Sequence, residues 1–282
     1  MTSIAETLAG AESILSASGI AEPRREAISL LTLATKKDRT FFYTHPDHAV
    51  TRDEAALLDA FLQRRASREP LQYISGVQEF YGLEFDVTPD VLIPRPETEM
   101  VVERAIEILL QQNGGRFCEV GVGSGCISIS ILHHRPNSTA VGLDVSSAAL
   151  QVARRNAQKH DVAGRLDLTD SDVFSALVDE KFDMIVSNPP YVPMRDIDGL
   201  QAEVRDFEPH SALTDGCDGL SIIRTIAGEA PKFLLPGGSL LMEIGFNQFS
   251  EVVKMFDSAR WQETELFPDL QGIPRLVHSR LN

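Results

Sequence analysis

The residues best suited to chemistry follow directly after a short apolar run. Met184, Ile185 and Val186 predict a buried strand, because continuous apolar runs suit strands that are covered on both faces. The run ends in Ser187 and is followed by Asn188, Pro189, Pro190 and Tyr191. A proline has no N–H for a central strand, and the residue before a proline is held extended. The result is a rigid corner that offers an amide side chain, an unpaired carbonyl at Pro189 and an aromatic ring. Taken alone, this corner is explained equally well as a proline-rich turn with a packed tyrosine.

A glycine-rich loop is the second chemical feature. A strand that we expect to end at Val120 runs into the loop Gly121–Gly125, and Glu119 lies just before the first glycine. Glycines let the backbone approach a ligand closely, and a helix N-terminus favours a carboxylate or a phosphate. Asp144 closes the next expected strand, where a carboxylate can accept hydrogen bonds from both ribose hydroxyls.

The spacing of this loop helps to identify its ligand. It is GxGxG and not the GxGxxG of dinucleotide binders. An adenosine ligand that carries a carboxylate in place of a pyrophosphate fits, and S-adenosylmethionine is the obvious candidate. NAD is the rival ligand, but no acid–base set for hydride transfer accompanies it. If the loop binds no ligand, it is only a tight glycine-rich turn, and Asp144 is unrelated to it.

With such a cofactor, the corner at Asn188 gains a chemical use. A planar, conjugated NH₂ group is a poor nucleophile because its lone pair is delocalised, as in any amide. Asn188 Oδ1 and the Pro189 carbonyl can each accept one N–H and so aim the nitrogen at a methyl group, while Tyr191 can stack on the planar group. This is positioning and electrostatic stabilisation, with no metal and no general base required before the transfer. The cationic product would then lose a proton to water.

The elements that must position these residues begin near residue 116, where strands and helices alternate. This alternation predicts a parallel sheet with helices on both faces. The expected strands end at Val120, Asp144, the Asp170–Asp172 segment, Asn188 and Ile244, and an antiparallel pair follows at residues 261–267 and 275–281. Ligands of open α/β sheets bind outside the carboxyl ends of the strands. Since Glu119, the glycine loop, Asp144, Asp172 and Asn188 all lie at such ends, we expect them to converge on one site.

The first third of the chain has a different character. Residues 1–70 predict a small helical bundle in which Thr51–Glu54 forms a capping box. This bundle is either a stabilising appendage or a docking module, and the residues do not separate the two. Residues 71–95 are β-prone and interrupted by glycines, which predicts a hairpin-like linker. Two prolines then hold Arg95 on a stiff loop, and Thr98 is placed to cap the next helix.

Charge limits the choice of substrate. The 282 residues carry a net charge of −15, of which residues 71–282 contribute −14. Such a domain repels phosphate backbones, so duplex nucleic acid is a poor substrate for it.

The compartment is indicated by three further features. Cys118, Cys126 and Cys217 form no CxxC spacing and fit reduced thiols of a cytosolic protein. Residues 1–20 lack the pattern of a secretory signal, and no apolar run approaches the roughly 18–20 residues that span a bilayer. We therefore expect a soluble, cytoplasmic protein without a membrane partner.

The chain resembles the HemK/PrmC-type N5-glutamine methyltransferases, which modify the glutamine of the Gly-Gly-Gln motif in peptide-chain release factors. The resemblance covers nearly all of the chain and rests on Glu69–Gly76, Phe80–Gly82, Leu92–Glu99, the glycine loop, Asp144, Asn188–Tyr191, Val204–Pro209 and Ala212–Leu213. The string Ile93–Glu99 together with Asn188–Tyr191 is highly specific, whereas the glycine loop indicates only a methyltransferase.

The resemblance implies a helical N-terminal domain (1–70) that helps to bind the release factor, a hairpin linker (71–95) and a Rossmann-like class I S-adenosylmethionine-dependent methyltransferase domain (96–282). The expected partners are class-1 release factors, and we expect a monomer. The cofactor residues would be Glu119, Gly121, Val122, Gly123, Ser124, Gly125, Asp144, Asp172, Val173 and Asn188. The substrate residues would be Asn188, Pro189, Pro190, Tyr191, Arg95 and Glu97, of which Asn188, Pro189 and Tyr191 are the expected catalytic residues.

Two positions depart from the family pattern. Glu119 stands where an aspartate is common, a change that keeps the acceptor. Val173 stands where an aromatic residue often flanks the adenine, so that packing is either weaker here or supplied by Phe174.

Two other functions must be weighed against this one. An Asn-Pro-Pro-Tyr corner also marks methyltransferases that act on adenine N6 or guanine N2, but those enzymes extract a base from its stack and need basic surfaces. The strongly acidic second part of the chain does not favour them. A non-catalytic binding protein that keeps the fold as a scaffold is the other possibility, and the intact corner at Asn188 argues against it.

Overall fold

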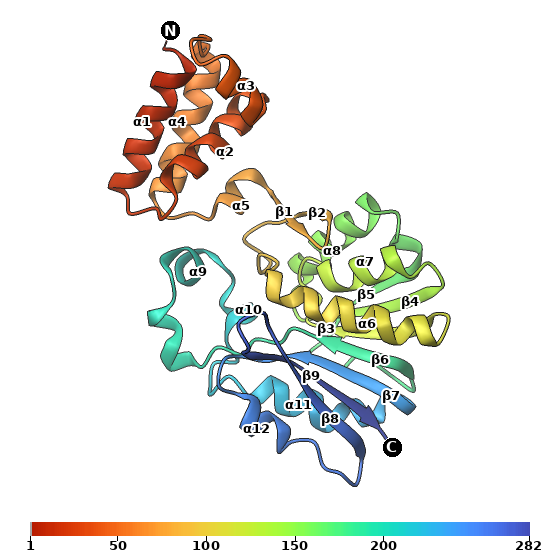
Figure 1. Ribbon diagram of the computed structural model, residues 1–282. Helices are drawn as coiled ribbons and strands as arrows, with labels where there is room; N and C mark the ends of the chain where they lie inside the picture. The colour runs from red at the N-terminus through yellow and green to blue at the C-terminus, as the bar shows by residue number, and fades with distance from the viewer. Residues whose placement is uncertain (1) are drawn as a thin grey trace. The chain divides into compact units, whose positions relative to one another are not determined.

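The computed structural model describes residues 2–282, which form two units (Figure 1). The helical unit contains the residues up to Gly76 together with a second segment, Gln201–Phe207. The sheet unit contains Val77–Leu200 and Glu208–Asn282. Among residues 2–282, no helix is both long enough and apolar enough to cross a bilayer.

The helical unit contains α1 (Ile4–Ala17), α2 (Pro23–Thr35), α3 (Arg39–Thr44), α4 (Arg52–Ala66), α5 (Leu71–Ser75) and α9 (Ala202–Phe207). The capping box predicted at Thr51 is confirmed. Thr51 Oγ1 accepts a hydrogen bond from the Glu54 N–H, and Glu54 Oε2 accepts one from the Thr51 N–H at 2.9 Å. Apolar side chains of α1, α2 and α4, among them Leu15, Leu31 and Leu58, form the core of this unit.

The segment after α4 differs from its predicted structure. Tyr73 and Ile74 belong to the β-prone linker by composition, but the structure places both in α5. Gly76 ends this helix in the left-handed conformation, with φ of 78°. Ile74 packs into the core of the helical unit, and this burial outweighs the β propensity of the segment. The helical unit therefore continues to Gly76.

The second segment of the helical unit is held by charge. Glu203 of α9 pairs with Arg65 at 3.0 Å and with Arg68 at 2.7 Å. Arg65 is buried and also pairs with Glu26 of α2. No local sequence pattern predicts that residues so distant in the chain belong to one unit.

The sheet unit contains nine strands among the described residues. They are β1 (Val77–Phe80), β2 (Leu83–Asp86), β3 (Gly115–Val120), β4 (Ser138–Asp144), β5 (Leu166–Asp170), β6 (Phe182–Ser187), β7 (Leu234–Glu243), β8 (Trp261–Pro268) and β9 (Pro274–Leu281). The first two form an antiparallel hairpin, and the other seven form one sheet in the order β5-β4-β3-β6-β7-β9-β8. Strands β3 to β7 are parallel, and the last two run antiparallel to their neighbours, which confirms the predicted fold class.

The helices of the sheet unit are α6 (Glu99–Gln111), α7 (Cys126–His134), α8 (Ser147–Lys159), α10 (His210–Leu213), α11 (Ser221–Glu229) and α12 (Phe249–Val253). Short 3₁₀ turns lie at η1 (Pro96–Thr98), η2 (Ala163–Arg165), η3 (Met194–Gly199) and η4 (Ala230–Lys232).

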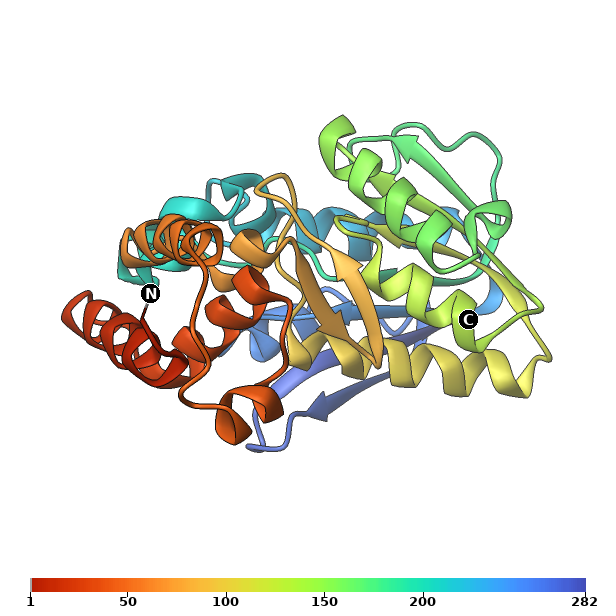
Figure 2. The same ribbon diagram turned by 90° about the horizontal axis from the view of Figure 1, so that it is seen from above.

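The helices cover both faces of the large sheet (Figure 2). Successive residues of a strand point to opposite faces. Met184 and Val186 of β6 accordingly join the cluster that packs with α6 and α7, whereas Ile185 joins the cluster that packs with α11 and α12. This two-sided burial explains why the central strands are continuously apolar.

The hairpin is fastened to the glycine loop by one buried amide. Asn156 of α8 accepts a hydrogen bond from the Asp86 N–H at 2.8 Å and donates to the carbonyl oxygens of Asp86 and Ser124. The loop that follows β2 is thereby anchored beside the residues that open α7.

The order of the sheet determines where a ligand can bind. The chain builds β4 and β5 on one side of β3 and then crosses to β6 and β7 on the other side. Crevices form where the direction of such an order reverses, outside the carboxyl ends of the strands. Here Val120 of β3 pairs with Ser187 of β6, so the glycine loop and Asn188 leave the sheet side by side.

Replacing Glu203 with alanine should destabilise the helical unit by about 1–3 kcal/mol, because the buried guanidinium of Arg65 loses one of its two carboxylates. Hydrogen exchange of the α4 amides measures this loss. The control is Glu251→Ala, which removes an exposed pair with Lys254 in the sheet unit and should change stability by no more than about 0.5 kcal/mol. Equal protection of α4 in Glu203→Ala and in the unmodified protein would contradict the assignment.

Candidate active site

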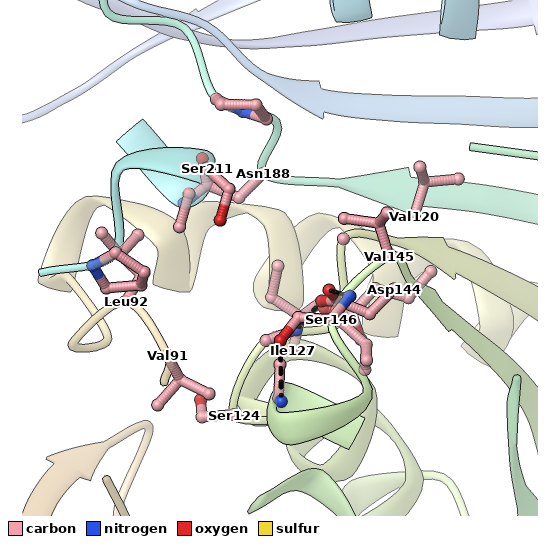
Figure 3. A pocket seen from close by; sticks show the side chains of 18 of the residues that line it. Val91, Leu92, Val120, Ser124, Ile127, Asp144, Val145, Ser146, Asn188 and Ser211 are labelled. Atoms are coloured by element: carbon pink, nitrogen blue, oxygen red, sulfur yellow. Dashed lines mark hydrogen bonds between the residues drawn. The ribbon is translucent and has the colours of Figure 1, made fainter. Parts of the chain in front are cut away.

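A cavity lies at the carboxyl ends of the central strands, and seven segments of the sheet unit build it (Figure 3). They are the loop after β2, the glycine loop with the start of α7, the loop after β4 with the start of α8, the loop after β5, the corner after β6, the start of α10 and Ile222 of α11. The predicted site residues that line it are Arg95, Glu119, Gly121, Val122, Gly123, Ser124, Asp144, Asp172, Val173, Asn188 and Pro190. The predicted residues Glu97, Gly125, Pro189 and Tyr191 are not part of its lining.

The glycine loop owes its shape to residues without a side chain. Gly123 and Gly125 have φ of 52° and 82°, in the left-handed region that disfavours side chains. A Cβ on Gly125 would also approach Ile129 Cδ1 to 2.7 Å. The amides of Gly121 and Val122 both donate to the carbonyl of Leu143, which fastens the loop to the end of β4.

Asp144 is held rigidly at the wall of the cavity. Its Oδ2 accepts a hydrogen bond from the Gly123 N–H at 2.8 Å, and its Oδ1 accepts one from the Ser146 N–H at 2.9 Å. Burial raises the pKa of this carboxyl, and the two N–H donors oppose that shift. Each oxygen keeps a lone pair, so the fixed carboxylate can still accept hydrogen bonds from a pair of hydroxyl groups.

Glu119 combines a structural contact with a place in the cavity. Its carboxyl is 1% exposed and accepts a hydrogen bond from the Ser128 N–H at 2.9 Å, in the first turn of α7. Burial raises the pKa of Glu119 to about 8. The longer side chain at this position thus reaches the helix N-terminus and satisfies one of its free donors.

The amide of Asn188 has a defined orientation. Its Nδ2 donates to Thr98 Oγ1 at 3.0 Å, and Thr98 Oγ1 in turn donates to Glu243 Oε2 at 2.7 Å. Within residues 2–282 no donor occupies Asn188 Oδ1 or the Pro189 carbonyl; Asn188 lines the cavity, whereas Pro189 is buried outside its lining.

Thr98 differs from its prediction. It occupies the N-cap position of α6, but its hydroxyl makes no capping hydrogen bond. The side chain is 2% exposed. Its Oγ1 accepts a hydrogen bond from Asn188 Nδ2, where a capping residue would accept one from a helix N–H, and its hydroxyl donates to Glu243 Oε2.

Tyr191 is fixed from several sides. Its OH donates to Glu243 Oε1 at 3.0 Å, and its carbonyl accepts a hydrogen bond from Gln248 Nε2 at 2.9 Å. A Cβ on Gly245 would lie 3.0 Å from the Tyr191 ring, so that glycine makes room for it. Burial raises the pKa of the phenol. The ring lies outside the cavity lining, and its stacking on a planar substrate group stays a prediction.

The proline-flanked loop around Arg95 is held in place by the buried carboxyl of Glu208. Arg95 Nη2 donates to Glu208 Oε1 at 2.5 Å, and Glu208 Oε2 accepts a hydrogen bond from the Ile93 N–H. Arg95 lines the cavity, whereas Glu97 is exposed and lies outside the lining.

The two residues expected to flank the adenine lie in different surroundings. Val173 lines the cavity with φ of 49°, an unusual conformation for a β-branched residue. Phe174 is 2% exposed and packs against Phe233 in the core, so it does not supply the aromatic contact considered for it. Val145, which follows Asp144, lines the cavity and is 64% exposed, and it offers the apolar surface instead.

Among the buried residues that the sequence did not assign to the site, two polar ones stand out, Thr98 and Glu243. Thr98 lines the cavity, and Glu243 joins Thr98 to Tyr191 below the corner. The signal for Glu243 was present, because it ends β7 as an acid after an apolar strand, in the same way as Asp144 ends β4. Among residues 2–282, no group of three or more His, Cys, Asp or Glu side chains is arranged to hold a metal ion.

Comparisons with known proteins agree with this architecture. Residues 6–76 match the PrmC N-terminal domain, and residues 101–203 match the methyltransferase small domain. A methyltransferase structure from Pyrococcus furiosus superposes with a TM-score of 0.52 at 17% identity, covering 77% of this chain and 98% of that one. At this identity the superposition shows the fold, which is that of a Rossmann-like methyltransferase.

Curated relatives are similar over nearly the whole chain. The release factor glutamine methyltransferase of Geobacter sulfurreducens is 41% identical over 95% of this chain and 93% of its own. The protein of the same name from Cereibacter sphaeroides is 42% identical over 98% of both chains. The chain therefore belongs to the release factor glutamine methyltransferase family.

Proposed function

We propose that this protein transfers a methyl group from S-adenosylmethionine to the side-chain amide nitrogen of the glutamine in the Gly-Gly-Gln motif of class-1 release factors. The observation that carries the proposal is the orientation of the Asn188 side chain, which lines the cavity. Its NH₂ group donates to Thr98, and its Oδ1 accepts no hydrogen bond from the described residues. The names of the relatives support the choice of substrate.

The residues of the cavity fit this cofactor. The fixed carboxylate of Asp144 suits the two ribose hydroxyls, and Val145 and Val173 offer apolar surface for the adenine. The glycine loop leaves room beside its backbone for the amino-acid part of the ligand. When bound, S-adenosylmethionine supplies a methyl group on a positively charged sulfur.

The corner at Asn188 would hold the substrate amide. A side-chain amide has two N–H donors, and Asn188 Oδ1 and the Pro189 carbonyl are two acceptors without a donor of their own among the described residues. Hydrogen bonds to both acceptors would fix the nitrogen and stabilise the positive charge that develops on it. The proton released afterwards would pass to water.

The corner is rigid enough for this task. Thr98, Glu243 and Gln248 hold its side chains and its backbone, so little reorganisation accompanies binding of the substrate. Groups that are already in place cost least at the moment of reaction.

A nucleobase amino group is not favoured as the target. Residues 71–282 carry a net charge of −14, which opposes the approach of a phosphate backbone. We propose that the protein acts as a monomer in the cytoplasm, without direct contact to nucleic acid. Its three free cysteines support the cytoplasmic part of this proposal.

The helical unit would dock the release factor. Its match to the PrmC N-terminal domain supports this role, as does the position of the chemically active residues outside it. Under this proposal the helical unit contributes to substrate recognition and the sheet unit performs the chemistry.

Replacing Asn188 with alanine should lower kcat for a release factor by roughly 10²–10³, because one of two acceptors for the substrate amide is lost. Binding of S-adenosylmethionine, measured by calorimetry, should be unchanged within about twofold. The substrate control is a release factor whose Gly-Gly-Gln glutamine is replaced by alanine. Transfer by Asn188→Ala at the unmodified rate would remove the role proposed for this residue.

Replacing Asp144 with alanine should weaken cofactor binding by about ten- to a hundredfold, since hydrogen bonds to a charged acceptor are lost. The matched control is Asp170→Ala. Asp170 ends the neighbouring strand β5, is exposed and lies outside the cavity lining. If both variants bind the cofactor equally well, Asp144 is not a cofactor residue.

A further inference from the structure

Glu243 is a buried carboxyl that the proposed reaction leaves without a role. It is 2% exposed at the end of β7 and makes no ion pair within residues 2–282. Its two hydrogen bonds come from the hydroxyl groups of Thr98 and Tyr191. Burying a carboxyl whose only partners are hydroxyl groups destabilises the folded protein, and such residues are expected mainly where they serve a function.

When Glu243 is ionised, the hydrogen bonds that join Glu243, Thr98 and Asn188 can have only one set of donors and acceptors. An ionised carboxylate only accepts, so the one hydroxyl proton of Thr98 goes to Glu243. Thr98 Oγ1 is then left with lone pairs and can only accept from its other neighbour. That neighbour must present its NH₂ group, which is what Asn188 does.

The opposite orientation would be unproductive. An Asn188 amide turned by 180° would aim its NH₂ group at the NH₂ group of the substrate, and two donors do not bind each other. An ionised Glu243 excludes this orientation through Thr98. A protonated Glu243 can donate to Thr98, and Thr98 can then donate to Asn188 Oδ1, which would favour the turned amide.

We propose that Thr98 and Glu243 are positioning residues that set which end of the Asn188 amide faces the substrate. The inference deepens the proposed function and rests on it. Neither residue is expected to touch the reacting nitrogen. Both act through Asn188, the first by a direct hydrogen bond and the second through the hydroxyl of the first.

The surroundings of Glu243 make its ionisation sensitive to pH. Burial raises the pKa of Glu243 to about 7, the hydroxyl donors of Thr98 and Tyr191 oppose this, Glu97 adds to it and Arg275 reduces it. Burial raises the pKa of the Cys126 thiol, and the charge of Glu243 adds to that shift. Since the ionised form is the productive one, kcat should fall as the pH drops through about 7.

The test compares two replacements of Thr98 that change opposite properties. Thr98→Val keeps the volume and removes the hydroxyl, whereas Thr98→Ser keeps the hydroxyl and removes a methyl group. We expect kcat for a release factor to fall about ten- to a hundredfold in Thr98→Val and to stay within about threefold in Thr98→Ser. A residue that only packs would give the reverse order, and that order would overturn the inference.

Glu243→Gln provides a second test that does not depend on the folding of Thr98→Val. It should remove the decline of kcat below pH 7, because a glutamine does not titrate while its Oε1 can still accept the hydrogen bond of Thr98, and cofactor affinity should stay within about twofold. An unaltered pH profile would overturn the inference. Thr139→Val, at an exposed position of β4, is the control for the loss of a threonine hydroxyl.

Failure of this inference is distinguishable from failure of the proposed function. If the unmodified protein does not methylate a release factor, the proposed function fails. If it does, and Thr98→Val has the same kcat while Glu243→Gln has the same pH profile, only the positioning role fails.

Discussion

The parallel pairing of β3 with β6 is the constraint on which the candidate site depends. Val120 lies opposite Ser187, and the Ser187 hydroxyl donates to the Val120 carbonyl at 2.7 Å. A slip by one residue would turn the apolar side chains of β6 to the wrong faces, so the two clusters of the core fix this register. The glycine loop and the Asn188 corner therefore leave the sheet at the same level. The proposed methyl transfer depends on this proximity of the loop and the corner.

The second feature of the site is the use of buried polar groups as rigid supports. Glu119 holds the start of α7, Glu208 latches Arg95, and Glu243 ties Thr98 to Tyr191. Each carboxyl is costly to bury, and each has its donors in place. This arrangement exchanges stability for groups that need no rearrangement when a substrate binds, and methyl transfer to an unreactive amide requires such preorganisation.

The sequence could predict what depends on local pattern. Continuous apolar strands and the residues at their ends gave the sheet and the cavity wall at Asp144 and Asn188, because strand ends of a parallel sheet share one edge. It could not predict what depends on distant partners. Thr98 follows a capping rule locally, but its hydroxyl accepts from Asn188 and donates to Glu243 on β7. Glu203 joins the helical unit through Arg65 and Arg68, and Tyr73 is helical because its segment is buried. In each case a tertiary contact outweighs the local preference.

The most direct test of the account is the identity of the methylated atom. The protein is incubated with S-adenosylmethionine and a whole release factor, and the peptide that contains Gly-Gly-Gln is fragmented in a mass spectrometer. We expect one added methyl group on the side-chain nitrogen of that glutamine, and none when the glutamine is replaced by alanine. A methyl group on any other residue, or on nucleic acid alone, would contradict it.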